Sequence, residues 1–214
     1  MNTLSAEEMG SIARQVIERE SAAVLSLKEQ LGSGLERVAS MLLECRGHIL
    51  VAGAGTSRAV AQRFAHLLAC CGSPGLFISA ADAIHGGAGA VGEKDVVYII
   101  SKGGGSAEIN RFAEIVKARG AKIIAHTERP DSALGLMSDA VFHVVAPGDA
   151  DPYGMIATGS SLVNAAACDV LCTLLLRMRG YTKEQFGHTH PGGAVGIRLQ
   201  EESRTTTTGN KGAL

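Results

Sequence analysis

The chain has 214 residues, of which 46% are hydrophobic and 19% charged, and its formal net charge at pH 7 is −1. This length suits one α/β domain, and a near-neutral charge without a basic stripe argues against binding to nucleic acid. The polar N-terminus MNTLSAEEMG does not resemble a signal peptide, and no uninterrupted apolar run reaches transmembrane length. The five cysteines form no CxxC pair. We therefore expect a cytoplasmic protein with free thiols and no membrane partner.

Two helices are expected before the first strand. Ser5 and Glu8 fit a capping box, and apolar residues then recur at helical spacing as far as Leu31. The segment 35–47 indicates a second helix that ends at a glycine. The sequence thus predicts an N-terminal helical hairpin over residues 1–47, whose apolar face covers the sheet or another subunit.

From residue 48 onward, short apolar strands alternate with helices. Strands are expected at 48–55, 75–79, 95–101, 121–127 and 141–145. Helices are expected at 57–72, 106–120, 132–140 and 160–180. This alternation predicts a three-layer αβα domain over residues 48–200, with a doubly wound, five-stranded parallel sheet of order 2-1-3-4-5. The polar, low-complexity segment 201–214 is expected to be a disordered tail.

In that strand order the first and third strands are neighbours, and the helices that follow them cover opposite faces. A ligand crevice opens beyond the carboxyl ends of such strands. The two loops at those ends are GAGTS and SKGGGS, so both glycine-rich loops should meet at one site.

The first loop combines a tight glycine turn with two hydroxyl groups at the start of a helix. It does not fit a nicotinamide site, because Arg58 replaces the third glycine of that fingerprint and no acid ends the second strand. Exposed amides and the helix dipole suit a phosphate group. The alternative is that Ser57 only caps its helix. The second loop repeats the arrangement, with Ser106 opening its helix, so the proposed ligand-binding residues are Gly53, Gly55, Thr56, Ser57, Ser101, Gly103, Gly104 and Ser106.

A third loop, FGHTHPGGAVG, covers residues 186–196. His188 and His190 have an H-x-H spacing, but no third ligand stands nearby in sequence, so we expect no metal site. Acid/base chemistry or sugar-ring opening by a histidine is the favoured use. His85 lies in another loop at the same sheet end. The remaining histidines are expected to be structural, namely His48, His66, His126 and His143.

With these three loops the chain resembles the sugar isomerase (SIS) domain family, most closely its arabinose-5-phosphate isomerase branch. The resemblance covers roughly residues 10–200, and it rests on LLECRGHILVAGAG, AADAIHGGAGAV, ISKGGGSAEI, ERPDSALGLMSDA, DPYGMIATGSSLVNAAACDVL and HPGGAVGIRL. It implies isomerisation of an aldose phosphate to a ketose phosphate through an enediol, without metal or cofactor. It also implies a homodimer or homotetramer in which a neighbouring subunit supplies a histidine. Members often carry C-terminal CBS domains, which we do not expect here.

The resemblance assigns catalytic roles residue by residue. His190 matches the HPGG histidine, His85 matches the histidine after the second strand, and Asp149 stands where the family has a glutamate. The resemblance places Ser57, Ser101 and Ser106 at the phosphate.

Three positions depart from the family pattern. Thr56 replaces a lysine, Gly105 replaces a glutamate, and Gly103 replaces a serine. We expect Lys102, in the neighbouring loop, to supply the missing cation, the alternative being a solvated loop lysine. The expected activity is therefore that of an aldose–ketose isomerase with altered site residues. The alternatives are a non-catalytic sugar-phosphate-binding module and a 6-phospho-3-hexuloisomerase.

Overall fold

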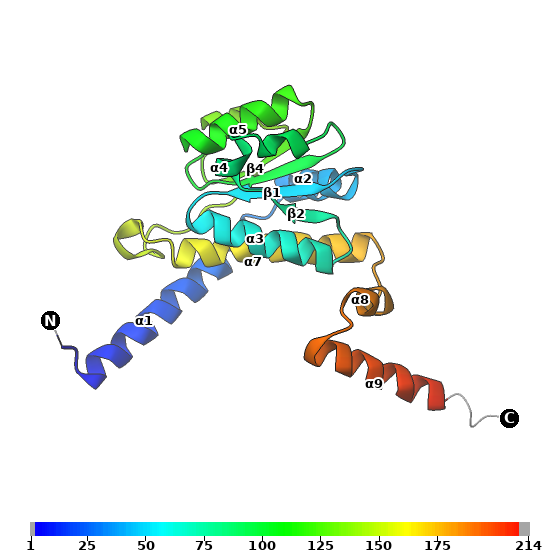
Figure 1. Cartoon of the computed structure of the whole chain (residues 1–214). Coiled ribbons are helices and arrows are strands. Elements are labelled where there is room, and N and C mark those ends of the chain that lie inside the picture. The colour runs from blue at the N-terminus through cyan, green and yellow to red at the C-terminus, as the bar shows by residue number, and fades with distance from the viewer. Residues whose placement is uncertain (1–2, 210–214) are drawn as a thin grey trace.

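The computed structural model describes residues 3–209, and its centre is a five-stranded parallel sheet (Figure 1). The strands are β1 (Ile49–Gly53), β2 (Gly75–Phe77), β3 (Val96–Ile100), β4 (Lys122–Thr127) and β5 (Ala140–His143). They lie in the order β2-β1-β3-β4-β5, which confirms the predicted topology. The pairing of Gly53 with Ile100 brings the carboxyl ends of β1 and β3 level with each other, so the loops that follow them start side by side.

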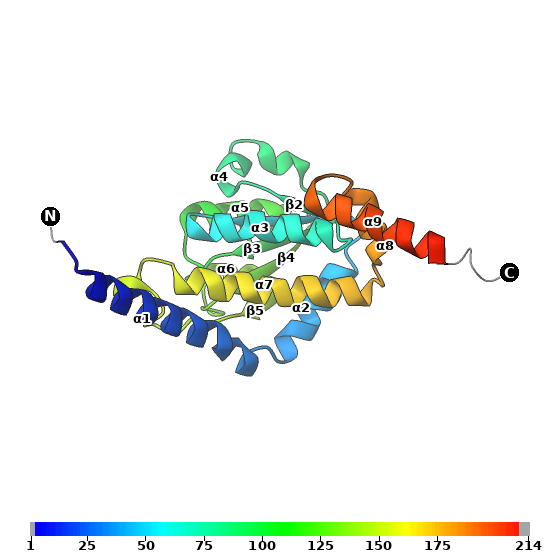
Figure 2. The ribbon, with the colours of Figure 1, turned by 90° about the horizontal axis from the view of Figure 1, so that it is seen from below.

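Helices cover both faces of the sheet. They are α1 (Ala6–Leu25), α2 (Ser33–Leu43), α3 (Thr56–Cys70), α4 (Ala80–Ala83), α5 (Ala107–Ala118), α6 (Ala133–Met137), α7 (Gly159–Met178), α8 (Lys183–Thr189) and α9 (Gly193–Gly209). The core on one face is formed with α2, α3 and α7, and the core on the other with α4, α5 and α6 (Figures 1 and 2). Because α3 and α5 lie on opposite faces, β1 and β3 form the switch point of the sheet, where a ligand is expected to bind at their carboxyl ends.

The apolar residues of β1 and β3 explain why these strands are buried between two layers of helices. Every residue of these two strands is buried, and the sequences ILVAG and VVYII show no alternation of apolar and polar positions. Continuous apolar runs of this kind are typical of parallel strands that are covered on both faces.

The helix α7 is the longest apolar segment of the chain. By length and composition it is apolar enough to cross a membrane, in contrast to the expectation from the sequence, but 50% of its most apolar window is buried within the domain. It packs against α1, α2 and α3, and Val163, Leu171 and Leu175 are fully buried there. The packing of α7 in the core therefore accounts for its composition.

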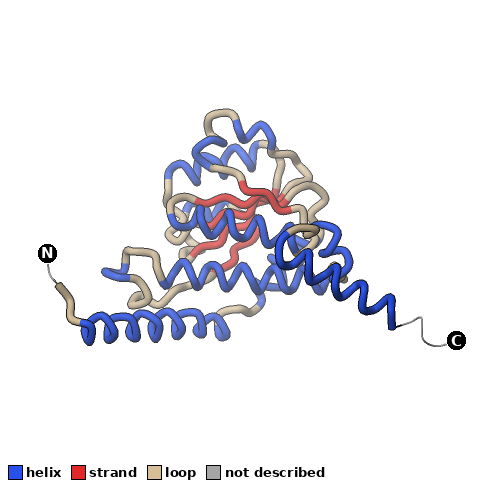
Figure 3. The backbone as a smooth tube through the Cα atoms, turned by 60° about the horizontal axis from the view of Figure 1, so that its bottom comes forward, coloured by secondary structure: helices blue, strands red, loops and turns tan. Residues whose placement is uncertain are grey.

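Both helices of the expected N-terminal hairpin are present, and Ser5 and Glu8 form the predicted capping box. A 3-10 turn at Ser26–Glu29 separates them. Each helix makes its main contacts with the domain: α1 lies along α7, whereas α2 packs on β5 and α7. The outer part of α1 extends beyond the domain (Figure 3). Apolar side chains of this helix are exposed, such as those of Met9, Ile12 and Ile17.

The C-terminal region differs from the sequence prediction. Two helices, α8 and α9, occupy most of the segment that we expected to be a loop and a disordered tail, and α9 continues to Gly209. Ion pairs of Glu202 with Arg198 and Lys183 support this helix despite the threonines that follow. Residues 210–214 of the expected tail lie outside the described residues.

Candidate active site

Two helices begin at the carboxyl ends of β1 and β3, directly after the glycine-rich loops. Gly55 precedes α3 and Ser106 precedes α5, and neither helix has a side-chain cap. By contrast, α1, α4, α6 and α8 are each capped by a serine or threonine hydroxyl. The helix α2 also lacks a side-chain cap, and in the first turn of α7 the Ser160 N–H is bound by Asp151. Ser57 therefore does not act as the cap of its helix. The first amides of α3 and α5 remain available to an anion at this edge of the sheet.

The glycines of the second loop have different roles. Gly104 has φ of 61°, and a side chain there would overlap the hydroxyl of Ser132, so the fold itself requires this glycine. A side chain at Gly103 would meet no atom within 4 Å. The backbone at Gly103 is thus open to a ligand. Among the loop hydroxyls, Ser101 is buried, whereas Thr56 and Ser106 are exposed.

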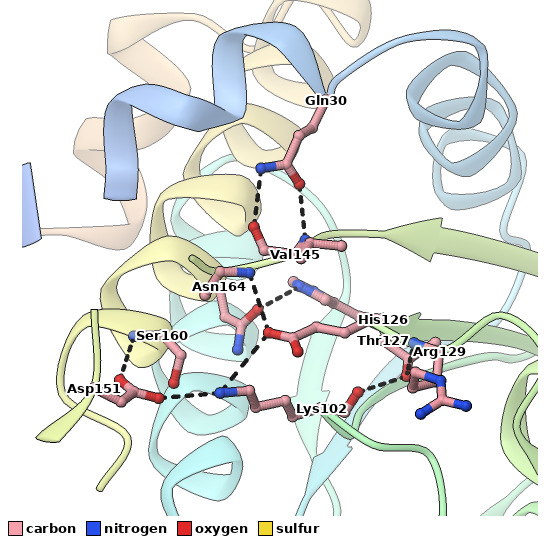
Figure 4. A network of polar contacts seen from close by, with 11 residues as sticks. Gln30, Lys102, His126, Thr127, Arg129, Val145, Asp151, Ser160 and Asn164 are labelled. Carbon is pink, nitrogen blue, oxygen red and sulfur yellow. Dashed lines mark hydrogen bonds and ion pairs between the residues drawn. The ribbon is translucent and has the colours of Figure 1, made fainter. Parts of the chain in front are cut away.

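Lys102 belongs to the second loop, and its side chain is directed at a pair of carboxylates (Figure 4). Its Nζ is 3.0 Å from Oδ2 of Asp151 and 3.9 Å from Oε1 of Glu128. Its carbonyl oxygen accepts hydrogen bonds from the Thr127 hydroxyl and the Glu128 N–H, both at 2.9 Å. Lys102 is therefore held in place at both ends, and it is not a solvated loop lysine.

Asp151 is the buried partner of this lysine. It is 5% exposed, and its Oδ1 accepts the Ser160 N–H in the first turn of α7 at 2.8 Å. Burial tends to raise the pKa of Asp151, but the hydrogen bonds from Ser160 and Lys102 outweigh this effect and hold its pKa below the usual value. Asp151 is thus a fixed anion that orients the lysine.

Glu128 is the more accessible carboxylate of the pair. Its Oε1 accepts the Ala146 N–H at 3.1 Å, and its side chain is 20% exposed. Within residues 3–209 its Oε2 has no hydrogen-bond partner. A carboxylate held by one oxygen and free at the other is suited to move a proton.

A buried polar chain lies beneath this cluster. The Tyr98 hydroxyl is 2.8 Å from Nδ1 of His126, and Nε2 of His126 is 3.0 Å from Oδ1 of Asn164. Burial lowers the pKa of His126 to about 4, against a smaller opposing effect of the Asn164 hydrogen bond. His126 is therefore neutral at physiological pH, in line with the structural role that we expected for it.

Two of the residues expected to be catalytic are outside the cluster. Asp149 is exposed and makes no side-chain hydrogen bond or ion pair with any described residue, so within one chain it stands apart from Lys102. The carboxylate that contacts Lys102 is Asp151, two residues later. His85 follows α4 near the carboxyl end of β2, where it is exposed and contacts neither Lys102 nor Glu128.

His190 lies at the other end of the domain within one chain. Its ring stacks on Phe186, with centroids 3.8 Å apart, and its Nε2 is 3.4 Å from Sγ of Cys70, the last residue of α3. The 15 residues of α3 separate this position from the first glycine loop by about 22 Å. His188 and His190 line a cavity of about 690 Å³ between α8 and α9. No group of three potential metal ligands occurs among residues 3–209.

The sequence interpretation missed Glu128 and Asp151, although a signal for Glu128 was present. Glu128 directly follows β4, which neighbours β3, so it emerges at the same edge of the sheet as the glycine loops. For Asp151 no spacing rule distinguishes it from Asp149, because both stand in the irregular segment before α7.

Comparison with known proteins adds independent evidence. A family model described as the SIS domain matches residues 41–174. The chain is 32% identical over 193 residues to arabinose 5-phosphate isomerase GutQ of Escherichia coli K12, which covers 90% of this chain and 60% of that protein. The chain thus spans about 60% of the length of this curated relative.

Solved structures agree with this match. A Listeria monocytogenes protein, described as a candidate sugar-phosphate isomerase, has a TM-score of 0.85 and 32% identity, covering 89% of this chain and all of that one. An E. coli CFT073 protein in complex with arabinose 5-phosphate has a TM-score of 0.84 and 26% identity, covering 88% of this chain and all of that one.

Proposed function

The chain belongs to the SIS domain family, and we propose that it is a sugar-phosphate isomerase that interconverts an aldose phosphate and a ketose phosphate. One observation carries the proposal: Lys102 and two carboxylates lie beside two helix N-termini that have no side-chain cap. Uncapped helix N-termini suit a phosphate, and a cation flanked by carboxylates suits proton transfer next to a carbonyl group.

The phosphate would bind to backbone amides and hydroxyls of residues 53–57 and 101–106. The open position at Gly103 and the exposed hydroxyls of Thr56 and Ser106 favour this placement. The first loop contains no ionisable side chain, so the amides and dipoles of α3 and α5 add to the positive charge that Lys102 brings to the site.

The isomerisation would use Glu128 and Lys102. Glu128 takes the proton from C2 of the open-chain aldose, and Lys102 stabilises the negative charge that develops on O1. The proton returns to C1 while the proton of O2 passes to O1, which gives the ketose. Asp151 keeps Lys102 in position throughout. This route through an enediol draws on protein side chains alone.

A histidine from a second copy of the chain completes the proposed site. Within one chain His190 is too far from Lys102 to act on the same sugar. The exposed apolar residues of α1 support assembly into a homo-oligomer. We assign ring opening to this histidine of the second copy, with His85 as the alternative from the same chain.

The test is proton exchange in D₂O, followed by NMR at C1 and C2 of the sugar. Arabinose 5-phosphate is the first substrate to examine, because the relatives above are named for it or hold it in their complex. Other five-carbon and six-carbon aldose and ketose phosphates complete the panel and include the substrate of a 6-phospho-3-hexuloisomerase. Deuterium incorporation with any of them supports the proposal.

A non-catalytic sugar-phosphate-binding protein is the competing candidate. The absence of an ionisable side chain from GAGTS favours it, since binding alone needs only amides and hydroxyls. Thermal stabilisation by a sugar phosphate without deuterium incorporation across the panel would support this candidate and reject the isomerase.

A further inference from the structure

The side chain of Asn164 extends from α7 toward the same region as the Lys102 cluster. Asn164 follows Ser160 by one helical turn, so both residues lie on one face of the helix, and the Ser160 N–H holds Asp151. Asn164 is half-buried, and its Oδ1 is directed at the ring of His126 (Figure 4). No step of the proposed isomerisation uses this residue.

The orientation of the Asn164 amide sets the hydrogen-bond chain behind it. The amide oxygen only accepts hydrogen bonds, so Nε2 of His126 must carry the proton and donate to it. Nδ1 of the neutral ring is then an acceptor, and the Tyr98 hydroxyl donates to it. Because Tyr98 and His126 are buried, no water competes for the bond between them.

The consequence concerns the other end of the amide. With Oδ1 fixed toward His126, the Nδ2 group turns away from the ring, toward the side on which Lys102 lies (Figure 4). Nδ2 finds no acceptor among residues 3–209, and it is not enclosed by the protein. Half-buried donors normally have a partner. The two N–H bonds of Nδ2 face a site where a polyhydroxyl ligand is expected.

We propose that Asn164 binds the sugar part of the ligand through its Nδ2 group, and that His126 and Tyr98 are positioning residues that fix this orientation. The inference rests on the proposed function in so far as the ligand is a sugar phosphate. The phosphate binds to the glycine loops in the proposed function, so Asn164 recognises a hydroxyl or carbonyl oxygen of the sugar. A site built to donate such a bond discriminates against sugars that lack the oxygen.

The direct test observes the side-chain amide of Asn164 by ¹⁵N NMR. Its signal is identified by its loss in Asn164→Ala. Titration with arabinose 5-phosphate and the other sugar phosphates of the panel should shift this signal together with the glycine-loop amides. Inorganic phosphate should shift the loop amides alone. An Asn164 signal that stays fixed while a sugar phosphate shifts the loop amides would overturn the inference, as would equal shifts with inorganic phosphate.

The same experiment separates this inference from the proposed function. If no sugar phosphate shifts any signal, the proposed function fails and the inference fails with it. If the loop signals move and that of Asn164 does not, only the inference fails.

Kinetics provide the second readout. Asn164→Ala should raise KM about 3- to 10-fold with a smaller change in kcat, as expected for loss of one hydrogen bond that binds substrate. Tyr98→Phe keeps the ring packing but frees His126 to change tautomer. Like Asn164→Ala, it should therefore raise KM, and it should weaken the response of the Asn164 amide to sugar phosphate. Thr173→Ala, an exposed position on the same helix, is the matched control and should leave KM unchanged. Unchanged KM in both Asn164→Ala and Tyr98→Phe would refute the inference.

Discussion

Lys102 and Asp151 are 49 residues apart in sequence, yet Nζ of the lysine donates to Oδ2 of the aspartate at 3.0 Å. The lysine belongs to the loop after β3, and the aspartate precedes α7, so the pair joins two elements at the carboxyl edge of the sheet. The aspartate is nearly buried while the lysine is partly exposed, with side-chain exposures of 2% and 39%. The carboxylate therefore fixes a cation whose outer side remains open to a ligand.

Replacement of the lysine tests whether this cation acts in turnover. Lys102→Ala should lower kcat/KM about 10²- to 10³-fold, because the charge on the enediolate oxygen loses its fixed counterion. Lys122→Ala is the matched control, since Lys122 is exposed at the opposite end of β4. Steady-state rates with the sugar phosphate identified by deuterium exchange measure both variants. A Lys102→Ala protein of full activity would remove the lysine from the mechanism.

The two aspartates before α7 allow a comparison within one short segment. Asp151→Asn should destabilise the fold by about 1–3 kcal/mol, because the Ser160 N–H and Lys102 lose a charged acceptor. It should also reduce kcat/KM at least tenfold by releasing Lys102. Asp149→Asn changes an exposed side chain and should alter neither quantity. Urea unfolding and steady-state kinetics compare the two, and equal effects would contradict the assignment.

Glu128 is the proposed base, and an amide at this position keeps the shape without the basicity. Glu128→Gln retains an oxygen for the Ala146 N–H, so the loop should keep its conformation. The expected result is a fall of about 10²- to 10⁴-fold in kcat with little change in KM. Deuterium incorporation at C1 and C2 should decline in parallel. If exchange continues at the wild-type rate, another residue is the base.

The sheet could be predicted from the sequence because its determinants are local. The apolar runs of β1 and β3 and the glycines after them define both the strands and the edge at which a ligand binds. The partners of Lys102 could not be predicted in this way. Choosing Asp151 over Asp149 depends on which carboxylate reaches the Ser160 N–H, and that is decided by how the segment before α7 folds back onto the sheet. The helices α8 and α9 were missed because the glycines and proline of 190–193 suggested a longer loop.

The buried His126 predicts a specific dependence of stability on pH. Its pKa is about 4 in the folded protein and about 6.5 when exposed in the unfolded chain. Between these values the unfolded chain binds a proton that the folded protein excludes, so the free energy of unfolding should fall as the pH drops from 6.5 toward 4. The loss attributable to His126 should approach about 3 kcal/mol near pH 4.

Comparison with His126→Gln isolates this contribution. The variant starts from a lower stability, because it loses ring packing, but its unfolding free energy should fall less steeply over the same pH range. His143→Gln, at an exposed position of β5, serves as the control and should retain the wild-type slope. Urea unfolding at several pH values measures all three proteins. Parallel curves for wild type and His126→Gln would mean that the histidine does not resist protonation in the fold.

The position of His190 predicts that two subunits share a site. Lys102→Ala and His190→Ala should each be nearly inactive. In a mixed dimer, one site would lack both residues and the other would contain both, so co-expression should restore activity at about a quarter of all sites if dimers form at random. If His190 instead served the Lys102 of its own chain, every mixed site would lack one residue and no activity would return. Steady-state rates of the co-expressed pair, compared with those of each variant alone, decide between these arrangements.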